Sequence, residues 1–343
     1  MNITENKQLQ NYNTFKVNAI SKYFAEIENK NDLLELFKSS VFINEKKFIL
    51  GEGANVLFKN NFDGLIIHSK INFINKIEED NNYVFFNVGS GTIWNDFLKY
   101  TLDLNLSGLE NLIDIPGQCG SAIVQNIGAY GVEIKNCVEK VNCINLEKPY
   151  NKTTLSKEEC KFGYRDSIFK HDFKNYFITD ITLKLNKKYT PILTYKELAK
   201  KYHTDINNFD SNTSNLTPQI IASEISQIRE RKLPNYKKIY NAGSFFKNPI
   251  VDEQFYKTNL LKYNLVTYPA ENNKIKLSAA QLIEQAELKG YRIKDAAVSN
   301  QHSLVLCNYG SATGEEIYDV AKHVVNTVCK KFGVKLQPET IIL

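Results

Sequence analysis

The chain has 343 residues, of which 43% are hydrophobic and 24% charged, and its formal net charge at pH 7 is +5. This length exceeds the usual size of one hydrophobic core and predicts two or three domains. The basic excess is small and scattered, which argues against a nucleic-acid-binding surface. No apolar run is long enough to cross a bilayer.

Cysteine and histidine spacing excludes the common metal sites. The six cysteines contain no Cys-x-x-Cys pair, and the five histidines contain no His-x-x-x-His pair. We therefore expect no metal and mostly buried, reduced thiols. The stretch "MNITENKQLQNYNTFKV" lacks the apolar core and cleavage site of a secretory signal, so we expect a cytoplasmic protein.

Hydrophobic periodicity predicts mixed helices and strands in the first half of the chain. In chain order, we expect a helix at 32–40, strand, turn and strand at 46–58, a strand at 63–69, strand, glycine-rich turn and amphipathic helix at 83–109, a loop-rich section at 115–131, and strands at 138–146 and 176–185.

The second half continues the same alternation. We expect a helix at 218–233 that stops before a proline, a helix at 277–289 followed by a glycine, short strands at 296–300 and 303–308, a long helix at 313–332, and a strand at 334–343. Thr313 can cap the long helix, with Glu315 and Glu316 in its first turn. The pattern predicts an α+β protein with three lobes.

One glycine pair imitates a dinucleotide-binding motif. "GEGANVLF", residues 51–58, begins as G-x-G, but Val56 stands where the third glycine should be. Strand-like sequence follows instead of a helix whose N-terminus could meet a pyrophosphate. The Rossmann interpretation therefore fails on context.

Two further glycine stretches follow, "GSGT" at 89–92 and "PGQCGSAIVQNIGAYG" at 116–131. Glycines let backbone amides approach phosphates, and neutral side chains near them add hydrogen-bond donors. The candidates of this kind are Asn55, Thr92, Ser121 and Asn126. Three such stretches together favour a large phosphate-bearing cofactor that lies over loops.

The segment "NAGSFFKNP", residues 241–249, places a serine between a flexible step and buried rings. The Ala-Gly step lets the backbone bend, the two phenylalanines favour burial, and Pro249 prevents a helix from continuing. We expect Ser244 to lie at the edge of a packed interior. A serine bonded to its own turn is the alternative.

Five motifs in this order resemble the UDP-N-acetylenolpyruvoylglucosamine reductase family over nearly the whole chain. They are "GEGANVLF", "IPGQCGSAIVQNIGAYG", "CKFGYRDSIFK", "NAGSFFKNP" and "QPE". The resemblance implies an α+β, three-lobed FAD-binding fold of the vanillyl-alcohol-oxidase type with a separate substrate-binding domain. The implied parts are a first FAD-binding lobe at 1–70 plus 334–343, a second at 71–225, and the substrate-binding domain at 226–333.

The resemblance also implies an activity. It is the NADPH-dependent reduction of UDP-N-acetylglucosamine enolpyruvate to UDP-N-acetylmuramate through non-covalently bound FAD, for peptidoglycan and cell wall synthesis. The implied partners are the UDP-sugar and NADPH, with no nucleic acid or membrane, and a monomer is expected. The alternatives are another FAD-dependent oxidase or dehydrogenase of the same fold, and a non-enzymatic nucleotide-binding module.

Site residues follow from the matched motifs. The resemblance makes Ser244 the proton donor, lets Arg165 hold the substrate carboxylate, and places Glu339 near the same group. The implied FAD contacts are Gly51, Glu52, Gly53, Ala54, Asn55, Val56, Leu57, Gly117, Ser121, Asn126, Ile127, Gly128 and Gly131. The implied substrate contacts are Tyr195, Lys232, Asn248, Tyr268 and Lys289. The roles of Gln301 and His302 stay open.

Overall fold

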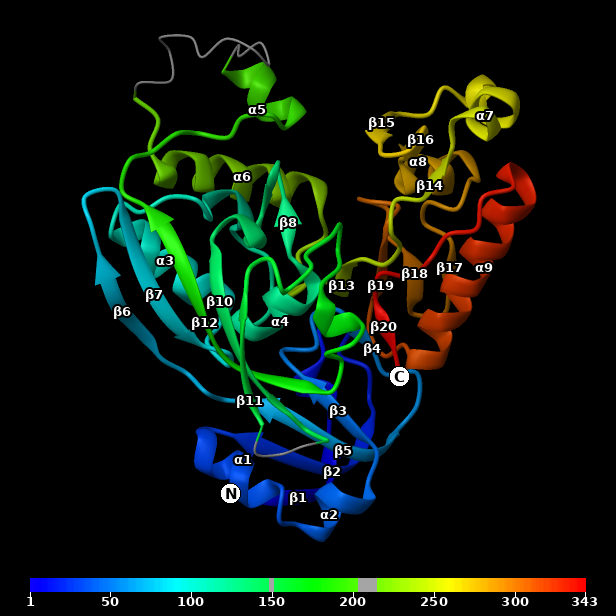
Figure 1. Cartoon of the computed structure of the whole chain (residues 1–343). Helices are drawn as coiled ribbons and strands as arrows, with labels where there is room; N and C mark the ends of the chain where they lie inside the picture. Colours follow the sequence, from blue (N-terminus) through cyan, green and yellow to red (C-terminus); the bar gives the residue numbers. More distant parts are fainter. Residues whose placement is uncertain (148–150, 203–214) are drawn as a thin grey trace. The chain divides into compact units, whose positions relative to one another are not determined.

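The computed structural model describes residues 1–147, 151–202 and 215–343 (Figure 1). These residues form two compact units. The first unit comprises Met1–Glu5, Tyr23–Glu52 and Gly64–Arg229, and the second comprises Asn6–Lys22, Gly53–Asp63 and Glu230–Leu343. The bounds of the three expected lobes stay a prediction, and the second of them includes both undescribed stretches.

A five-stranded antiparallel sheet of order β11-β10-β12-β7-β6 forms the centre of the first unit. Its strands are β6 Ile74–Glu79, β7 Tyr83–Gly89, β10 Val138–Asn145, β11 Lys152–Ser156 and β12 Tyr176–Asn186. The central strand, β12, is buried along most of its length, whereas the edge strand β6 is mostly exposed.

Helices cover one face of this sheet (Figure 1). They are α3 Trp94–Asp103, α4 Cys119–Gln125 and α6 Pro218–Lys232, and a shorter helix, α5 Lys196–Lys201, precedes α6. Trp94 and Phe97 of α3 are fully buried, and the ring of Phe97 meets Phe86 of β7 edge-on at 6.0 Å. This packing fixes the glycine-rich turn that joins β7 to α3.

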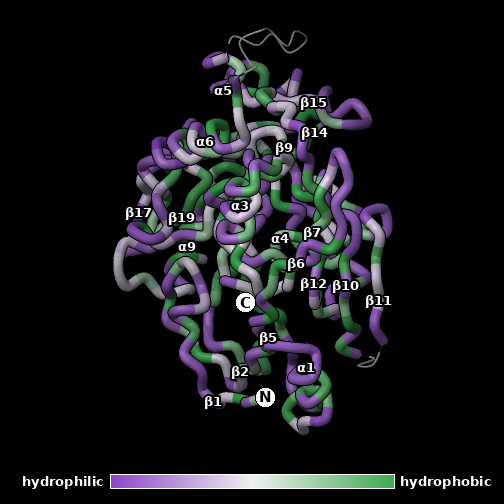
Figure 2. Tube along the Cα trace, turned by 90° about the vertical axis from the view of Figure 1, so that its left-hand side faces the viewer, coloured by the Kyte–Doolittle hydropathy of each residue, from purple (hydrophilic) through white to green (hydrophobic). Residues whose placement is uncertain are grey.

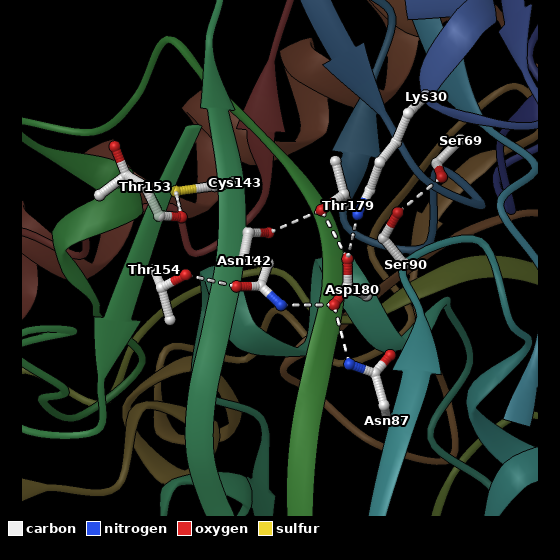
Figure 3. A network of polar contacts seen from close by, with 10 residues as sticks. All are labelled: Lys30, Ser69, Asn87, Ser90, Asn142, Cys143, Thr153, Thr154, Thr179 and Asp180. Carbon is white, nitrogen blue, oxygen red and sulfur yellow. Dashed lines mark hydrogen bonds and ion pairs between the residues drawn. The ribbon is translucent and has the colours of Figure 1, made fainter. Parts of the chain in front are cut away.

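A polar network crosses the other face of the sheet (Figure 3). The buried carboxylate of Asp180 on β12 accepts hydrogen bonds from Asn87 of β7, Asn142 of β10 and the hydroxyl of Thr179. Lys30 places its ammonium 3.7 Å from the same carboxylate. Because every oxygen of Asp180 is paired, the network ties three strands together without an unsatisfied charge.

A second sheet has the order β1-β2-β5-β3. Its strands are β1 Ile3–Gln8, β2 Ile20–Ile27, β3 Lys47–Leu50 and β5 Phe62–Ser69, and the helices α1 Lys30–Leu36 and α2 Ser40–Asn44 lie between β2 and β3 in the chain. The edge strand β1 is hydrophilic (Figure 2), which discourages pairing with other chains. Asn29 and Asp32 form a capping box that starts α1.

The second unit contains two small sheets, of order β13-β19-β18-β17 and β14-β16-β15. Their strands are β13 Tyr240–Ser244, β14 Ile250–Asp252, β15 Thr267–Ala270, β16 Lys274–Leu277, β17 Arg292–Ile293, β18 Ala296–Val298 and β19 Val305–Asn308. The helices are α7 Glu253–Phe255, α8 Ala279–Gln285 and α9 Gly314–Phe332, and α9 packs on β17, β18 and β19.

The predicted ends of α9 are confirmed. Thr313 and Glu316 form a capping box at its start, and Gly333 ends it with φ +69°. Glycine suits that left-handed conformation because it has no Cβ to clash with the preceding turn.

Three predicted elements differ from the structure. The section 115–131, expected as loop, contains the helix α4, whose Gly120 packs against Ser90. Helix α8 ends at Gln285, because Glu287 already has φ +61°, so Gly290 is not its cap. The expected terminal strand is only β20, Ile341–Ile342, which pairs in parallel with β4, Val56–Leu57.

Within the described ranges, no helix is both long and apolar enough to cross a membrane. In the same ranges, no group of His, Cys, Asp and Glu side chains is arranged to hold a metal ion. Five of the six cysteines are buried, and Cys329 is exposed.

Candidate active site

Ser244 ends strand β13 at the margin of the core, as the sequence predicts. It lies opposite Val305 of β19, and the next amide, that of Phe245, donates to the carbonyl of Leu304 at 2.8 Å. Phe245 and Phe246 are fully buried, whereas Ser244 is half-buried. The hydroxyl is therefore carried by backbone that two aromatic anchors and a strand pairing hold in place.

The residue before Ser244 has a special conformation. Gly243 has φ +71°, and a Cβ built there would meet no heavy atom within 4 Å. Its amide donates to the side chain of the buried Asn241 at 2.9 Å. Glycine is required here by the backbone angle rather than by crowding, and open space lies next to Ser244.

The structure brings Glu339 to the same segment. The Glu339 amide donates to the carbonyl of Phe245 at 2.7 Å, and the Lys247 amide donates to the carbonyl of Gln337 at 2.9 Å. The Asn55 side-chain amide donates to the Glu339 carbonyl at 3.1 Å. Two of the three residues assigned to the chemistry thus share one backbone arrangement in the second unit.

Arg165 belongs to the first unit and lies on a tight turn. Gly163 and Asp166 exchange backbone hydrogen bonds of 2.9 and 3.2 Å, and Arg165 between them has φ +53°. Its guanidinium Nη2 donates to the Gly128 carbonyl at 2.6 Å, and the Lys170 ammonium donates to the Arg165 carbonyl at 2.8 Å. A left-handed arginine is strained, so the surroundings must hold this turn in place.

The stretch 117–131 is a helix followed by a hairpin. After α4, the strands β8 Gly128–Ala129 and β9 Val132–Glu133 pair with each other. The two residues that join them, Tyr130 and Gly131, have φ +49° and +86°. Positive φ at both positions is the signature of a type I′ turn, which explains the letters "GAYG".

Three of the glycines assigned to FAD lie in crowded surroundings, Gly53 against backbone and Gly51 and Gly117 against Ser121. A Cβ at Gly53 would lie 2.1 Å from the Tyr12 carbonyl oxygen, so this glycine is required by packing. A Cβ at Gly51 would lie 3.1 Å from the Ser121 Cβ, and one at Gly117 would lie 3.3 Å from the Ser121 Oγ. The two predicted flavin stretches therefore approach each other at Ser121, where added side chains would narrow the space between them.

The amides of residues 52–55 suit a phosphate-bearing ligand. Among the residues described here, none accepts a hydrogen bond from the amides of Glu52, Gly53, Ala54 or Asn55. Backbone N–H groups of this kind are common phosphate ligands. The chain thus fits the diphosphate of FAD through its main chain.

The neutral side chains near the glycines are engaged within the protein. The Ser121 hydroxyl donates to the Gln118 carbonyl at 2.9 Å, and Thr92 donates to the Phe73 carbonyl at 3.2 Å. Asn126 is fully buried and bonded on both ends of its amide. The prediction that these groups are free donors failed for two reasons. Thr92 and Asn126 bond to distant segments, which leave no local pattern, whereas Ser121 bonds within the first turn of a helix that was expected to be loop.

The residues assigned to the substrate have diverse surroundings. In the second unit, Asn248 accepts the Ala279 amide at the start of α8 at 3.0 Å, and Lys289 pairs with Glu284 at 3.2 Å. Tyr268 is 48% exposed. In the first unit, Tyr195 meets the ring of Tyr130 edge-on at 4.6 Å.

His302, whose role the sequence left open, is partly defined by its neighbours. Its Nδ1 accepts the Leu304 amide at 3.2 Å, which places it beside the backbone that holds Phe245. Burial, together with the nearby charges of Lys232 and Lys289, lowers its pKa, although Glu284 opposes this. His302 therefore favours the neutral form, with the remaining proton on Nε2.

Asn111 was missed by the sequence analysis. It is fully buried, and its side-chain amide donates to the carbonyls of Tyr130 at 2.7 Å and Ile192 at 3.0 Å. It thus joins the hairpin turn to the segment that leads into Tyr195. No local signal identifies such a residue, because both acceptors are main-chain carbonyls of other segments.

Proteins with similar sequences are known. The UDP-N-acetylenolpyruvoylglucosamine reductase of Flavobacterium johnsoniae is 40% identical over 350 residues, which cover 100% of both chains. That of Aliivibrio fischeri is 39% identical, over 99% of this chain and 94% of the relative. This chain belongs to the UDP-N-acetylenolpyruvoylglucosamine reductase family.

Two protein-family models match separate parts of the chain. "FAD binding domain" matches residues 21–147, and "UDP-N-acetylenolpyruvoylglucosamine reductase, C-terminal domain" matches residues 234–343. The crystal structure of the reductase from Thermus caldophilus has the same fold, with a TM-score of 0.66 and 22% identity over 99% of this chain and 98% of that one. The predicted α+β FAD-binding fold of the vanillyl-alcohol-oxidase type is confirmed.

Proposed function

We propose that this chain reduces UDP-N-acetylglucosamine enolpyruvate to UDP-N-acetylmuramate with NADPH and FAD, in peptidoglycan synthesis in the cytoplasm, as a monomer. Its membership of the reductase family supports the reaction. The observation in the structure that carries the proposal is the pairing of the Ser244 strand with Glu339, through the 2.7 Å bond from the Glu339 amide to Phe245.

The stretches 51–57 and 117–131 would hold FAD. Main-chain amides of 52–55 would bind the diphosphate, and the absence of side chains at Gly51 and Gly117 would let the cofactor lie close to the backbone near Ser121. Bound FAD supplies hydride transfer, from NADPH to the enolpyruvyl double bond.

Ser244 would donate the proton. Once one carbon of the double bond has received hydride, the carbon beside the carboxylate carries negative charge and needs a proton. A hydroxyl is a stronger acid than that carbon and can deliver the proton if it is held within reach. The strand pairing and the buried phenylalanines give Ser244 a fixed position.

Arg165 and Glu339 would stabilise the charge. A guanidinium can hold a carboxylate with two parallel hydrogen bonds and stabilise the enolate that develops from it. The tight turn gives Arg165 a defined orientation in the first unit. Glu339, half-buried in the second unit, would bind near the same substrate group.

Five residues would bind the nucleotide end of the substrate. Lysine ammonium groups suit phosphate oxygens as point charges, and phenol hydroxyls and amides add neutral hydrogen bonds. They are Tyr195, Lys232, Asn248, Tyr268 and Lys289.

An oxidase that tethers its flavin through Cys119 is the less favoured function. The Cys119 sulfur is fully buried, and burial raises its pKa well above the ordinary range of a thiol. Since the thiolate is the reactive form, this cysteine is a poor candidate for a covalent flavin bond.

The two half-reactions test the proposal. Ser244→Ala should bind FAD and be reduced by NADPH at the normal rate, because neither step needs the hydroxyl. Reoxidation by the enolpyruvyl substrate without oxygen should slow about 100-fold to 10,000-fold, the usual cost of losing a positioned acid. Stopped-flow absorbance of the flavin measures both steps.

Ser303→Ala is the matched control, because Ser303 lies two residues before Val305, the partner of Ser244, and is fully buried, yet bonds to Glu284. It should leave both half-reactions within a few-fold of the parent. Equal slowing of both half-reactions in Ser244→Ala, or no slowing of reoxidation, would reduce Ser244 to a structural residue.

A further inference from the structure

Asn126 lies where the second flavin stretch meets the turn that carries Arg165. It ends α4 in the left-handed conformation, with φ +44°, and its side chain is fully buried. Asparagine tolerates this conformation better than other residues with a Cβ. Glycine could adopt the same backbone conformation at position 126. The buried side chain of Asn126 is therefore not needed for the backbone angle, and its hydrogen bonds show what it does.

Both ends of the Asn126 amide are bonded within the first unit. The Nδ2 group donates to the Gly163 carbonyl at 2.8 Å and to the Glu133 carboxylate at 3.0 Å, and Oδ1 accepts the Lys135 amide at 3.3 Å. An amide has two N–H donors, and both are used. This leaves Asn126 no donor for a flavin.

Two more hydrogen bonds join the same two segments. Arg165 Nη2 donates to the Gly128 carbonyl at 2.6 Å, and the Ser167 hydroxyl donates to the Val124 carbonyl at 2.8 Å. The residues 163–167 are thus attached at their beginning, middle and end to the residues 124–128. A strained residue such as Arg165 keeps its backbone angles only where its surroundings determine them in this way.

We propose that Asn126 is a positioning residue that fixes the Arg165 turn on the flavin stretch through the Gly163 carbonyl, and that it is not itself a flavin ligand. The proposal rests on the role of Arg165 in the proposed function. Asn126 and Ser167 are both buried, with 0% and 1% of their surface exposed, whereas Arg165 is half-buried. Asn126 is also held by its hydrogen bonds with Glu133 and Lys135, which fix the direction of its bond to Gly163. Its loss lets the guanidinium move away from the substrate carboxylate.

Asn126→Gly tests this with little disturbance of the backbone, because glycine accepts the left-handed angle. The variant should keep its FAD and its rate of reduction by NADPH. Its reoxidation by the enolpyruvyl substrate should slow on the order of a hundredfold, as displacements of about 1 Å at a reacting group do. Asn264→Gly is the matched control: Asn264 also ends a helical turn with φ +53°, but is exposed.

Asn126→Asp is the second variant, for the case that glycine destabilises the fold. It keeps the size and the acceptor for Lys135, but a carboxylate cannot donate to Gly163 and faces the charge of Glu133. It should slow reoxidation at least as much as glycine does. The double variant Asn126→Gly with Arg165→Ala should be reoxidised no more slowly than Arg165→Ala alone, because both changes remove the same contribution, that of the Arg165 guanidinium.

Hydrogen exchange of residues 163–167 gives a readout that is independent of catalysis. These amides should exchange at least tenfold faster in Asn126→Gly than in the parent and in Asn264→Gly, since an unattached turn opens more often. Unchanged exchange would overturn the proposal, as would loss of flavin from Asn126→Gly. A double variant that is slowed by the product of the two single effects on reoxidation would also overturn it. If Arg165→Ala itself leaves reoxidation unchanged, the role of Arg165 in the proposed function is wrong, and the exchange rates alone decide the positioning by Asn126.

Discussion

The segments that carry Ser244 and Arg165 hold their side chains in opposite ways. Ser244 ends a strand, and the backbone of the next residue, Phe245, bonds on both sides, to Leu304 and to Glu339. The rings of Phe245 and Phe246 are buried. Arg165 lies on a turn with a strained angle, attached to its neighbours by side-chain hydrogen bonds from Asn126, Arg165 itself and Ser167.

The two side chains are therefore held in position by different interactions. A paired strand next to a hydrophobic core is stabilised by burial, and many substitutions of its exposed residues are tolerated. A turn fixed by a few side-chain hydrogen bonds depends on each donor, because a buried carbonyl left without its partner costs free energy. We therefore expect the strand to be sensitive to loss of volume and the turn to be sensitive to loss of single donors.

The largest expected effect tests the strand. Phe245→Ala removes a fully buried ring that meets Phe246 at 5.1 Å and Phe15 at 6.3 Å. The free energy of unfolding should fall by about 3–5 kcal/mol, the usual cost of such a cavity. Urea unfolding measures it. Phe255→Ala, at a half-buried position, is the control, and an equal loss in both variants would contradict the importance of this anchor.

A smaller effect tests the strain at the turn. Arg165→Gly and Arg165→Ala both remove the guanidinium, so both should slow reoxidation of the flavin by the substrate to the same extent. Only glycine relieves the left-handed angle of φ +53°, so it should be the more stable variant by about 1 kcal/mol. Thermal or urea unfolding of the pair measures this difference. Alanine equal to glycine in stability would mean that the turn stores no strain.

The smallest effect is a pH dependence on the strand side. Burial lowers the pKa of His302, whose Nδ1 accepts the Leu304 amide beside the Ser244 strand. His302 therefore binds a proton more readily in the unfolded chain than in the folded chain. As a result, the free energy of unfolding falls as the pH drops below the ordinary histidine pKa of about 6.5. Above that value the contribution of His302 is fully present.

His302→Gln should flatten this fall, because glutamine does not titrate and can still accept the Leu304 amide. The free energies of unfolding at pH 7.5 and pH 5.5, in parent and variant, give the comparison at roughly the span over which histidine titrates. The same decrease in both proteins would show that His302 does not cause the acid sensitivity.

The same contrast explains what the sequence could predict. The pair Phe245 and Phe246, the capped helix α9 and the strand–turn–helix from β7 to α3 follow from local periodicity and capping, which the structure confirms. The family motifs named the candidate site, whose residue roles stay proposals. The α4 helix was missed because its glycines and serine predict loop.

Other features could not be predicted because they depend on distant partners. The attachments of Asn126 and Asn111 join segments that are 37 and 81 residues away, through main-chain carbonyls that every residue possesses. Nothing in the local letters distinguishes such an asparagine from one in a surface turn. The shortness of β20 likewise follows from its pairing with β4 rather than from its own composition.

The pairing of β20 with β4 also sets an order of events during synthesis. The side chain of Asn55 bonds to Glu339, which is 284 residues later in the chain. At a ribosomal rate of about 5–20 residues per second, the partner emerges roughly 15–60 s after Asn55. Throughout that interval the segment 53–57, which we propose binds FAD, lacks its neighbouring strand, so the nascent chain completes this part of the cofactor site only after residues 339–342 have been synthesised.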